Sequence, residues 1–219
     1  MVGAETALYQ QMMIDEIADA VRPSGLAVLG AFHHDDDQTL VLLGPHEPTF
    51  WPLFIQSVEY LEKRENPLDR WSQRVIGAWA DEFNGIAVFP FGGPPYHPFI
   101  GWALRSGHAW QSPVGLLVHD TAGLFVSYRG ALLIPERLDL PAAGSPPCEN
   151  CSEKPCLSAC PAAALGQEGY DIPKCHAHLD IAGNECLSSG CAVRRACPVG
   201  QNKRLRLQSA FHMRAFHKG

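Results

Sequence analysis

The sequence lacks two features that would place the protein in or across a membrane. No apolar run approaches the ~20 residues that a transmembrane helix needs. The segment MVGAETALYQQMMIDEIADA contains acidic side chains and no uninterrupted apolar core, so it does not resemble a secretory signal peptide. We therefore expect a soluble, cytoplasmic protein with no membrane span.

Cysteine is absent from the first 147 residues, and all eight cysteines lie in the last third of the chain. Their opening run reads C-x2-C-x4-C-x3-C-P. It is close to the ferredoxin pattern C-x2-C-x2-C-x3-C-P, in which the fourth cysteine binds the other of two [4Fe–4S] clusters. Eight thiolates supply two clusters with none left over. The predicted metal ligands are Cys148, Cys151, Cys156, Cys160, Cys175, Cys186, Cys191 and Cys197.

Disulfides and zinc are the alternatives to clusters. Disulfides require an oxidising compartment, and the N-terminal sequence argues against one. Zinc sites favour paired C-x2-C motifs with nearby histidines. One such pair occurs, formed by Cys148 and Cys151. Iron–sulfur clusters are therefore the favoured interpretation.

Charge is divided unevenly along the chain. Residues 1–147 carry 8 basic and 17 acidic side chains, and residues 148–219 carry 9 basic and 6 acidic ones, which together give the net charge of −6. Basic segments often bind nucleic acid. However, a [4Fe–4S] cluster with four thiolates is negative, and cationic neighbours offset that charge. Because no aromatic-interleaved binding pattern accompanies the charge, we do not expect a nucleic-acid partner.

The first 140 residues alternate between helix-like and strand-like patterns. Two β-like runs, Leu26–Phe32 and Thr39–Gly44, predict a hairpin. A second hairpin is predicted where Val114–His119 and Leu124–Pro135 flank a D-T-A-G turn. The expected helices are Glu5–Val21, Pro48–Arg64 and Pro67–Phe83, and a further strand is expected at Ile86–Pro90.

The segment PAAGSPP, residues 141–147, reads as a stiff linker between two parts of the chain. We therefore predict an α+β protein with two domains. The first, residues 1–142, contains the mixed helices and strands. The second, residues 143–219, contains the cysteines and a basic C-terminal tail.

The region around this linker resembles a known group of enzymes. The segments GWALRSGHAWQSPVGLLVHDTAGLFVSYRGALLIPERLDLP, PPCENCSEKPCLSACPAAAL and YDIPKCHAH are similar to the corrinoid iron–sulfur enzymes, which include epoxyqueuosine reductases and reductive dehalogenases. In that group a cobalamin-binding α/β domain precedes a ferredoxin-like module with two clusters. The resemblance implies one cluster on Cys148, Cys151, Cys156 and Cys197, and another on Cys160, Cys175, Cys186 and Cys191. The chain departs from the group's spacing between Cys151 and Cys156 and in its second run, C-x4-C-x5-C-P.

A second resemblance covers the front half of the chain. The segments TFWPLFIQSVEYLEKRENPLDRW and GLLVHDTAGLFVSYRGALLIP are similar to the CblC-type cobalamin-processing protein. Its fold is nitroreductase-like, with a mixed sheet flanked by helices. The resemblance implies the same fold for residues 1–142, beside a small ferredoxin-like module. The implied cofactors are two [4Fe–4S] clusters and cobalamin.

Five residues outside the cysteine set are further candidates. Arg129 lies where the CblC-type protein has an arginine that lines its cobalamin pocket, and a surface ion pair is the alternative. Arg105 and His108 match a turn near the corrinoid in the reductase group, and positioning of the linker is the alternative. Histidine titrates near neutrality, so His97 and His119 are candidate catalytic proton donors or cobalt ligands. A packed, hydrogen-bonded histidine is the alternative for each.

Together, these patterns predict an oxidoreductase that passes electrons through two clusters to a corrinoid, either to reduce or process cobalamin or to reduce a small substrate. The expected electron donor is a ferredoxin or a flavoprotein. The acidic catalytic motif of epoxyqueuosine reductases is missing from the front half, which argues against the tRNA-modifying reaction. Three alternatives stay open: an electron carrier whose front domain only docks a partner, a flavin enzyme, and a nucleic-acid enzyme that uses the basic tail.

Overall fold

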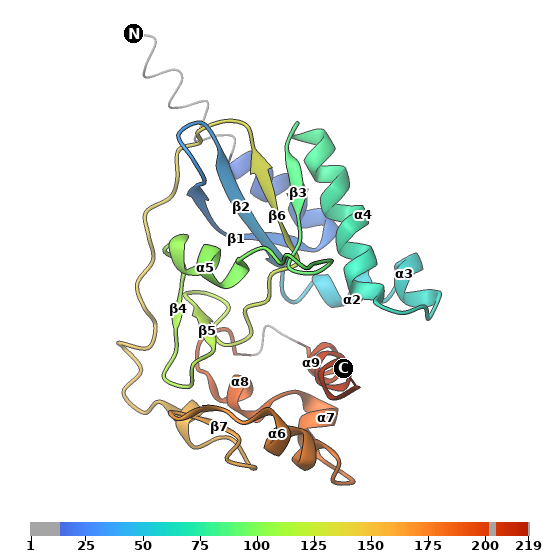
Figure 1. The fold of residues 1–219 in the computed structure, drawn as a ribbon, viewed down its shortest axis with the longest axis vertical. Helices are drawn as coiled ribbons and strands as arrows, with labels where there is room; N and C mark the ends of the chain where they lie inside the picture. Colours follow the sequence, from blue (N-terminus) through green and yellow to red (C-terminus); the bar gives the residue numbers. More distant parts are fainter. Residues whose placement is uncertain (1–13, 202–204, 219) are drawn as a thin grey trace. The chain divides into compact units, whose positions relative to one another are not determined.

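The structure is a computed structural model that describes residues 14–201 and 205–218. It divides into two compact units (Figure 1). Among the described residues, the sheet unit comprises 14–107 and Ser127–Ala143, and the cysteine unit comprises His108–Val126, 144–201 and 205–218. The last boundary falls inside the predicted linker. However, residues 108–126 leave the predicted front domain and join the cysteine unit.

The sheet unit is built on a four-stranded sheet with the order β1-β2-β6-β3. Its strands are β1 (Leu26–His33), β2 (Thr39–Pro45), β3 (Ile86–Val88) and β6 (Gly130–Ile134). Every residue of β2 is buried, which explains why its sequence is a continuous apolar run rather than an alternating one. The predicted α+β class is confirmed. The predicted mixed sheet is wrong for the described residues, because each pairing in this sheet is antiparallel.

The first predicted hairpin forms, and the second does not. In the first, β1 pairs with β2 from Leu26 opposite Pro45 to His33 opposite Thr39. In place of the second, β5 (Leu117–His119) pairs with β4 (Ala109–Gln111), while β6 pairs with β2 and β3. The apolar pattern on both sides of the turn indicated burial correctly. It does not tell which of two cores each run enters.

Helix α4 (Pro67–Glu82) covers the sheet by packing against β3 and β6 (Figure 1). Its proline occupies the first turn, where a missing amide hydrogen costs little. Residues 14–21 also form a helix, and the rest of the predicted helix Glu5–Val21 lies outside the described residues. The buried side chains of α4 follow helical spacing and are Leu68, Trp71, Ser72, Ile76 and Ala80.

The predicted helix Pro48–Arg64 breaks into α2 (Phe50–Phe54) and α3 (Val58–Leu61). The break falls at Ser57, whose backbone is extended and whose hydroxyl accepts a hydrogen bond from the amide of Tyr60 at 3.4 Å. A serine in this position caps the start of a new helix. A further short helix, α5 (Phe99–Arg105), packs against β1.

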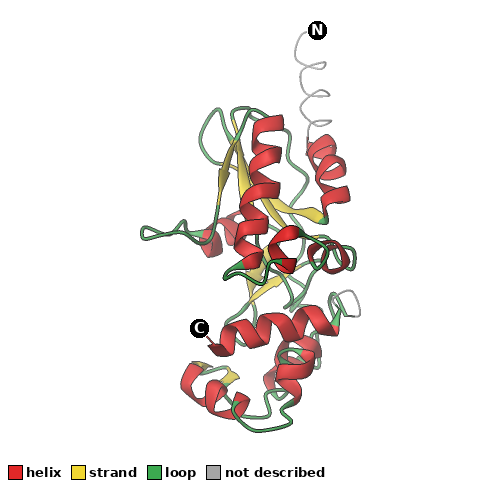
Figure 2. Cartoon of the chain, turned by 90° about the vertical axis from the view of Figure 1, so that its right-hand side faces the viewer, coloured by secondary structure: helices red, strands yellow, loops and turns green. Residues whose placement is uncertain are grey.

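The cysteine unit consists mainly of short helices and loops (Figure 2). Besides β4 and β5 it contains the 3-10 turn η2 (Pro155–Leu157), the strands β7 (Leu165–Gly166) and β8 (Gly169–Tyr170), and the helices α6 (Ile172–Leu179), α7 (Glu185–Ser189), α8 (Ala192–Ala196) and α9 (Arg206–Lys218). One apolar core joins the β4–β5 segment to the cysteine region. Its buried members are Val114, Val118, Leu124, Cys156, Leu165, Val193 and Cys197.

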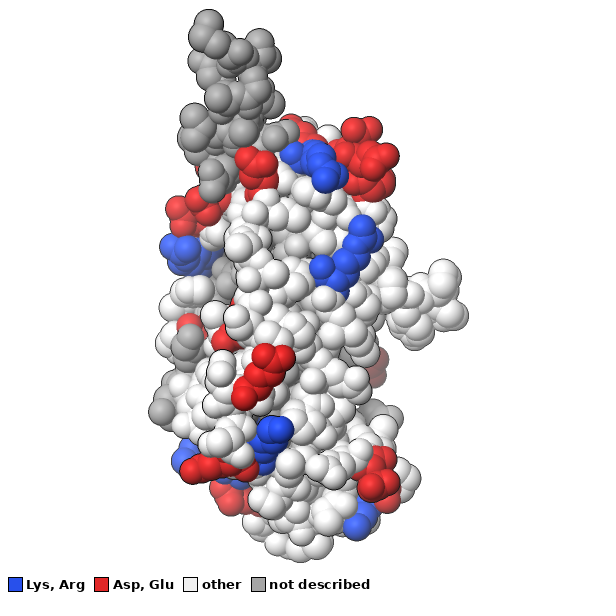
Figure 3. All heavy atoms as spheres, turned by 90° about the vertical axis from the view of Figure 1, so that its left-hand side faces the viewer, with Lys and Arg blue, Asp and Glu red and all other residues white. Residues whose placement is uncertain are grey.

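The described surface carries charges of both signs. On the face drawn in Figure 3, acidic and basic side chains are interspersed among large uncharged areas. This face therefore presents no broad basic patch of the kind that binds nucleic acid. Among the described helices, none combines the length and the apolar character needed to cross a membrane.

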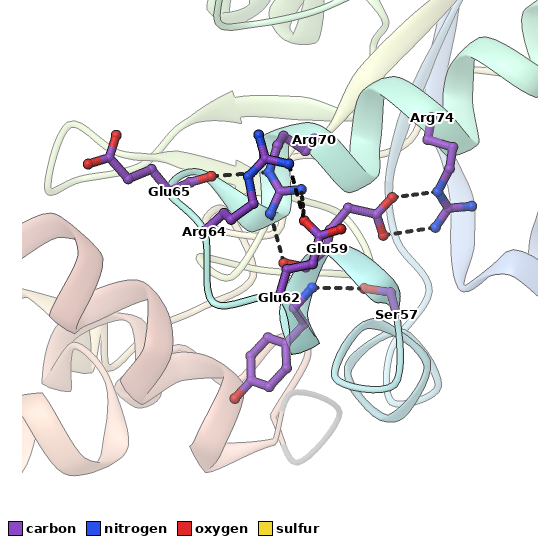
Figure 4. A network of polar contacts seen from close by, with 8 residues as sticks. Ser57, Glu59, Glu62, Arg64, Glu65, Arg70 and Arg74 are labelled. Carbon is purple, nitrogen blue, oxygen red and sulfur yellow. Dashed lines mark hydrogen bonds and ion pairs between the residues drawn. The ribbon is translucent and has the colours of Figure 1, made fainter.

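An ion-pair network fastens α3 to α4 (Figure 4). The almost fully buried carboxylate of Glu59 accepts hydrogen bonds from Nε and Nη2 of Arg74 at 2.5 and 3.0 Å. Arg70 donates to the carbonyl of Glu59 and to the carboxylate of Glu62, both at 2.9 Å. The hydrogen bonds from Arg74 lower the pKa of Glu59 from 4.5 to about 2. A carboxylate with a lowered pKa stabilises the folded state near neutral pH.

Replacing Glu59 with glutamine is expected to destabilise the protein by about 2 kcal/mol at pH 7. This value is smaller than the full pKa shift implies, because the partner Arg74 is 55% exposed. Since the folded-state pKa is lowered, the contribution of Glu59 is present above pH 4.5 and is lost as the pH falls toward 2. Urea unfolding of wild type and variant at several pH values should show a difference that shrinks in acid.

The matched control is Glu62→Gln. Its carboxylate is 35% exposed and pairs with Arg64 and Arg70, so we expect a loss below ~1 kcal/mol. Equal losses in the Glu59 and Glu62 variants, or a difference that does not change with pH, would contradict the stabilising role of the buried carboxylate.

Candidate metal centres

The eight cysteines line two cavities in the cysteine unit. Each cavity has a volume of about 350 Å³, which includes its open mouth. All eight thiols are free. Cavity A is lined by Cys148, Cys151, Cys156 and Cys197, and cavity B by Cys160, Cys175, Cys186 and Cys191. These two sets of cysteines coincide with the ligand sets that the resemblance to corrinoid iron–sulfur enzymes implies.

Turns and one short helix bring the thiols of cavity A together. Cys148 lies in a turn directly after the linker, and Cys151 follows it closely. Cys156 lies in η2, which begins after Lys154 adopts a left-handed conformation with φ of 42°. Cys197 is the C-cap of α8, with an extended backbone. The residues 108–126 complete the wall with Ser112, Pro113, Val118 and Leu124.

Three helices supply cavity B. Cys175 lies in α6, Cys186 lies in α7, and Cys191 is the N-cap of α8. Cys160 comes from the loop before Pro161. Helix α8 therefore connects the two cavities, because a thiol of cavity B stands at its N-terminal end and a thiol of cavity A stands at its C-terminal end.

The two cavities also share one apolar core. Leu165 and Val193 line cavity B, whereas Val118 and Leu124 line cavity A, and all four belong to the same cluster of buried side chains. Val193 is fully buried and lies in α8 between its two cysteine ends. Groups bound in the two cavities would therefore be neighbours across a packed, water-excluding wall.

Sulfur atoms in cavity B accept hydrogen bonds from the chain. The amide of Ala164 donates to Sγ of Cys160 at 3.2 Å, and the hydroxyl of Tyr170 donates to Sγ of Cys175 at 3.3 Å. Burial and the neighbouring thiol Cys175 raise the pKa of Tyr170, so its phenol keeps its proton and remains a donor at neutral pH. Hydrogen bonds to sulfur are a principal means of tuning iron–sulfur centres.

Burial and mutual repulsion act on the thiols of both cavities. Burial raises the pKa of Cys148 and Cys156, and the neighbouring thiolates of cavity A raise both further. Burial also raises the pKa of Cys175 and Cys186, despite the hydrogen bond that Tyr170 donates to Cys175. Metals bind thiolates rather than thiols, so loading either cavity would release protons and would be favoured by higher pH.

A cluster and a single metal ion place different demands on a set of four thiols. Among the described residues, no three His, Cys, Asp or Glu side chains form a group that could hold one metal ion. A zinc site would require four sulfur atoms about 2.3 Å from one centre. In a [4Fe–4S] cluster each cysteine binds a different iron, so the four thiols stand farther apart around a larger space. Four thiols line each cavity, which matches the number of cysteine ligands of a [4Fe–4S] cluster.

His108 and His119 hold the turn that follows β5. Nδ1 of His108 lies 2.7 Å from the carboxylate of Asp120. His119 is 3% exposed, and its Nδ1 lies 2.9 Å from the same carboxylate and accepts a hydrogen bond from the amide of Thr121 at 3.1 Å. These contacts support the alternative of hydrogen-bonded, packed histidines.

The other three candidates lie in the sheet unit. His97 is exposed, with its ring centroid 5.4 Å from that of Trp102. The guanidinium of Arg105 lies over the ring of Phe32 at 4.5 Å and donates to the carbonyl of His33 at 2.5 Å. Neither contact points to a bound cofactor.

Arg129 is 14% exposed, and its guanidinium lies 3.7 Å from Asp69. Burial lowers the pKa of Arg129, and it raises the pKa of Asp69. The ion-pair alternative is thus observed, although the pair is more buried than a surface pair. His108 belongs to the cysteine unit, whereas Arg105 and Arg129 belong to the sheet unit.

Sequence reasoning missed Tyr170 and the wall of cavity A that residues 108–126 supply. Tyr170 stands five residues before the predicted ligand Cys175. This short separation could have identified its phenol as a candidate hydrogen-bond donor to the sulfur. No comparable signal marked residues 108–126, because their apolar pattern fits any buried hairpin.

Comparison of the chain with models of known protein families, with curated proteins and with solved structures found no match.

Gly123 is expected to be essential for cavity A. Its φ is +57°, and a Cβ atom there would lie 2.1 Å from the carbonyl oxygen of Val199 and 3.1 Å from Sγ of Cys197. Gly123→Ala should therefore displace the turn from the Cys197 segment, cost at least ~2 kcal/mol and reduce iron binding at cavity A. Unfolding experiments and iron analysis after anaerobic reconstitution would measure both effects.

The control is Gly115→Ala in the same segment, residues 108–126. Gly115 also has a positive φ, +77°, but a Cβ atom there meets no atom within 4 Å. Its cost should be limited to backbone strain of about 1 kcal/mol, with normal iron content. Equal iron loss in both variants would contradict the proposed contact between the turn and cavity A.

Proposed function

We propose that this chain is an electron-transfer protein that binds two [4Fe–4S] clusters, one in each cavity. The observation that carries the proposal is that eight cysteines, all free, line two cavities in two sets of four. The donor chemistry fits the group, since cysteine thiolates in sets of four are the usual ligands of this cluster. Such clusters, when bound, supply one-electron transfer.

Three features of the chain support a two-centre path. The residues of α8 span from a ligand of one cavity to a ligand of the other. The wall between the cavities is apolar and contains Leu165 and Val193. The hydrogen bonds from Ala164 and Tyr170 to sulfur stabilise added negative charge in cavity B.

We further propose that the electrons pass to a corrinoid, from a ferredoxin or a flavoprotein as donor. This part rests on the two sequence resemblances. Reduction of cobalt in a corrinoid proceeds in single-electron steps, which suits a one-electron carrier. The sheet unit would then bind the corrinoid. In the alternative, it docks a protein partner and the chain is an electron carrier alone.

Anaerobic reconstitution with iron and sulfide should yield about eight iron atoms per chain. Replacing two ligands of one cavity, as in Cys148→Ala with Cys151→Ala, should lower this to about four. The pair Cys175→Ala and Cys186→Ala should do the same for cavity B. Ser188→Ala changes an exposed side chain of α7 and is the control with unchanged iron content. Binding of zinc in place of iron and sulfide would contradict the proposed clusters. Loss of both clusters in each double variant would contradict two independent sites.

Corrinoid binding is tested by EPR of the cluster-loaded protein with and without cob(II)alamin. We expect the cobalt signal to shift to a base-off form, because binding in a protein pocket displaces the lower axial ligand. An unchanged cobalt signal beside intact cluster signals would leave the electron carrier as the function.

A further inference from the structure

The two cavities differ in the polar groups that face their sulfur atoms. Cavity B has a side-chain donor, the hydroxyl of Tyr170, 3.3 Å from Sγ of Cys175. The amide of Ala164 adds a second hydrogen bond, to Cys160 at 3.2 Å. The ring of Tyr170 stacks on Phe216 with centroids 6.0 Å apart.

A partly buried cation, Arg194, also interacts electrostatically with Cys191 and Tyr170 of cavity B. Arg194 follows Cys191 by three residues on α8, which places the two on one face of the helix. Its guanidinium donates a hydrogen bond to the carbonyl of Leu124. Among the described residues, no carboxylate lies within ion-pair distance of Arg194, whereas the neighbouring Arg195 is paired with Glu185 at 2.9 Å. The charge of Arg194 is therefore not cancelled locally.

Cavity A differs in kind: its thiol Cys156 accepts hydrogen bonds from the backbone amides of Cys156 and Leu157, and its wall includes the hydroxyl of Ser112. Its cation is Lys154, whose side chain is exposed and therefore screened by water. Its wall is otherwise made largely of apolar side chains. They include Pro113, Val118, Leu124, Pro147, Pro155, Pro198 and Val199. Two of its four thiols, those of Cys156 and Cys197, are buried, against one in cavity B, that of Cys186.

The reduction potential of an iron–sulfur cluster rises with hydrogen bonds to sulfur and with nearby positive charge, and it falls with burial in apolar surroundings. We propose that cavity B holds the higher-potential cluster of the two, with Tyr170 and Arg194 as the residues that set the difference. This inference rests on the proposed function. Its consequence is that the first electron supplied by the donor would reduce the cluster in cavity B, while the cluster in cavity A would stay oxidised.

The test is an anaerobic redox titration of the reconstituted full chain, followed by EPR. Tyr170→Phe removes the hydroxyl and keeps the ring, and it should move the higher of two reduction waves to more negative potential. Arg194→Met should move the same wave in the same direction, and Arg194→Lys should restore most of the shift because it keeps the charge. The lower wave should stay in place in all three variants.

Tyr96→Phe and Arg64→Met are the controls. They make the same chemical changes at exposed positions in the sheet unit, and neither should move a wave. Movement of the lower wave in Tyr170→Phe, or two waves that coincide in the wild type, would overturn the inference while leaving the clusters established. A wild type without cluster signals after reconstitution would instead overturn the proposed function, and the inference with it.

Discussion

Both candidate centres depend on the length of one helix. Helix α8 has five residues, with Cys191 capping its start and Cys197 capping its end. Five helical residues rise about 7–8 Å, so the two thiols stand at opposite ends and face different cavities. One residue fewer would turn the second cysteine by about 100° around the helix axis. The wide C-x5-C-P spacing is therefore what a separating helix requires.

A second constraint is the size of the cysteine unit. Its C-terminal part, Gly144–Gly219, has fewer than 80 residues and is made of short helices and turns. A segment of this length rarely builds an adequate apolar core by itself. The inserted segment His108–Val126 adds Val114, Val118 and Leu124 to that core. Metal binding would add further stability, since a group bound only by the folded state stabilises it.

Local patterns predicted the elements that depend on local interactions. The hairpin of β1 and β2, helix α4 and the strand at Ile86 all follow from periodicity and from turn residues. The break at Ser57 was not predicted, because the apolar spacing continues across it and a serine cap is a weak signal within a helical pattern. In the candidate site, the resemblance to corrinoid iron–sulfur enzymes implied the same two sets of four cysteines that line the two cavities.

The remaining errors concern long-range pairing. Nothing in Leu124–Pro135 indicates that its first residues enter one core and its last residues another. The contact of Arg194 with the carbonyl of Leu124 joins residues 70 positions apart, and no local pattern encodes it. Arg129 lies beside Asp69, and His119 lies beside Asp120. The sequence does not indicate which acidic residue becomes the neighbour of either side chain. Sequence patterns thus identified candidate site residues but did not predict which residues contact them in the fold.

The interleaving of the two units also affects how the chain folds during synthesis. The chain passes from one unit to the other three times, after Gly107, Val126 and Ala143. On the ribosome, the segment 108–126 emerges before Cys156, Val193 and Cys197, the partners that later cover Val118 and Leu124. At a synthesis rate of about 5–20 residues per second, the apolar face of this segment stays uncovered for several seconds before these partners are made. The interval is a period of exposure in which a chaperone or early metal delivery would protect the nascent protein.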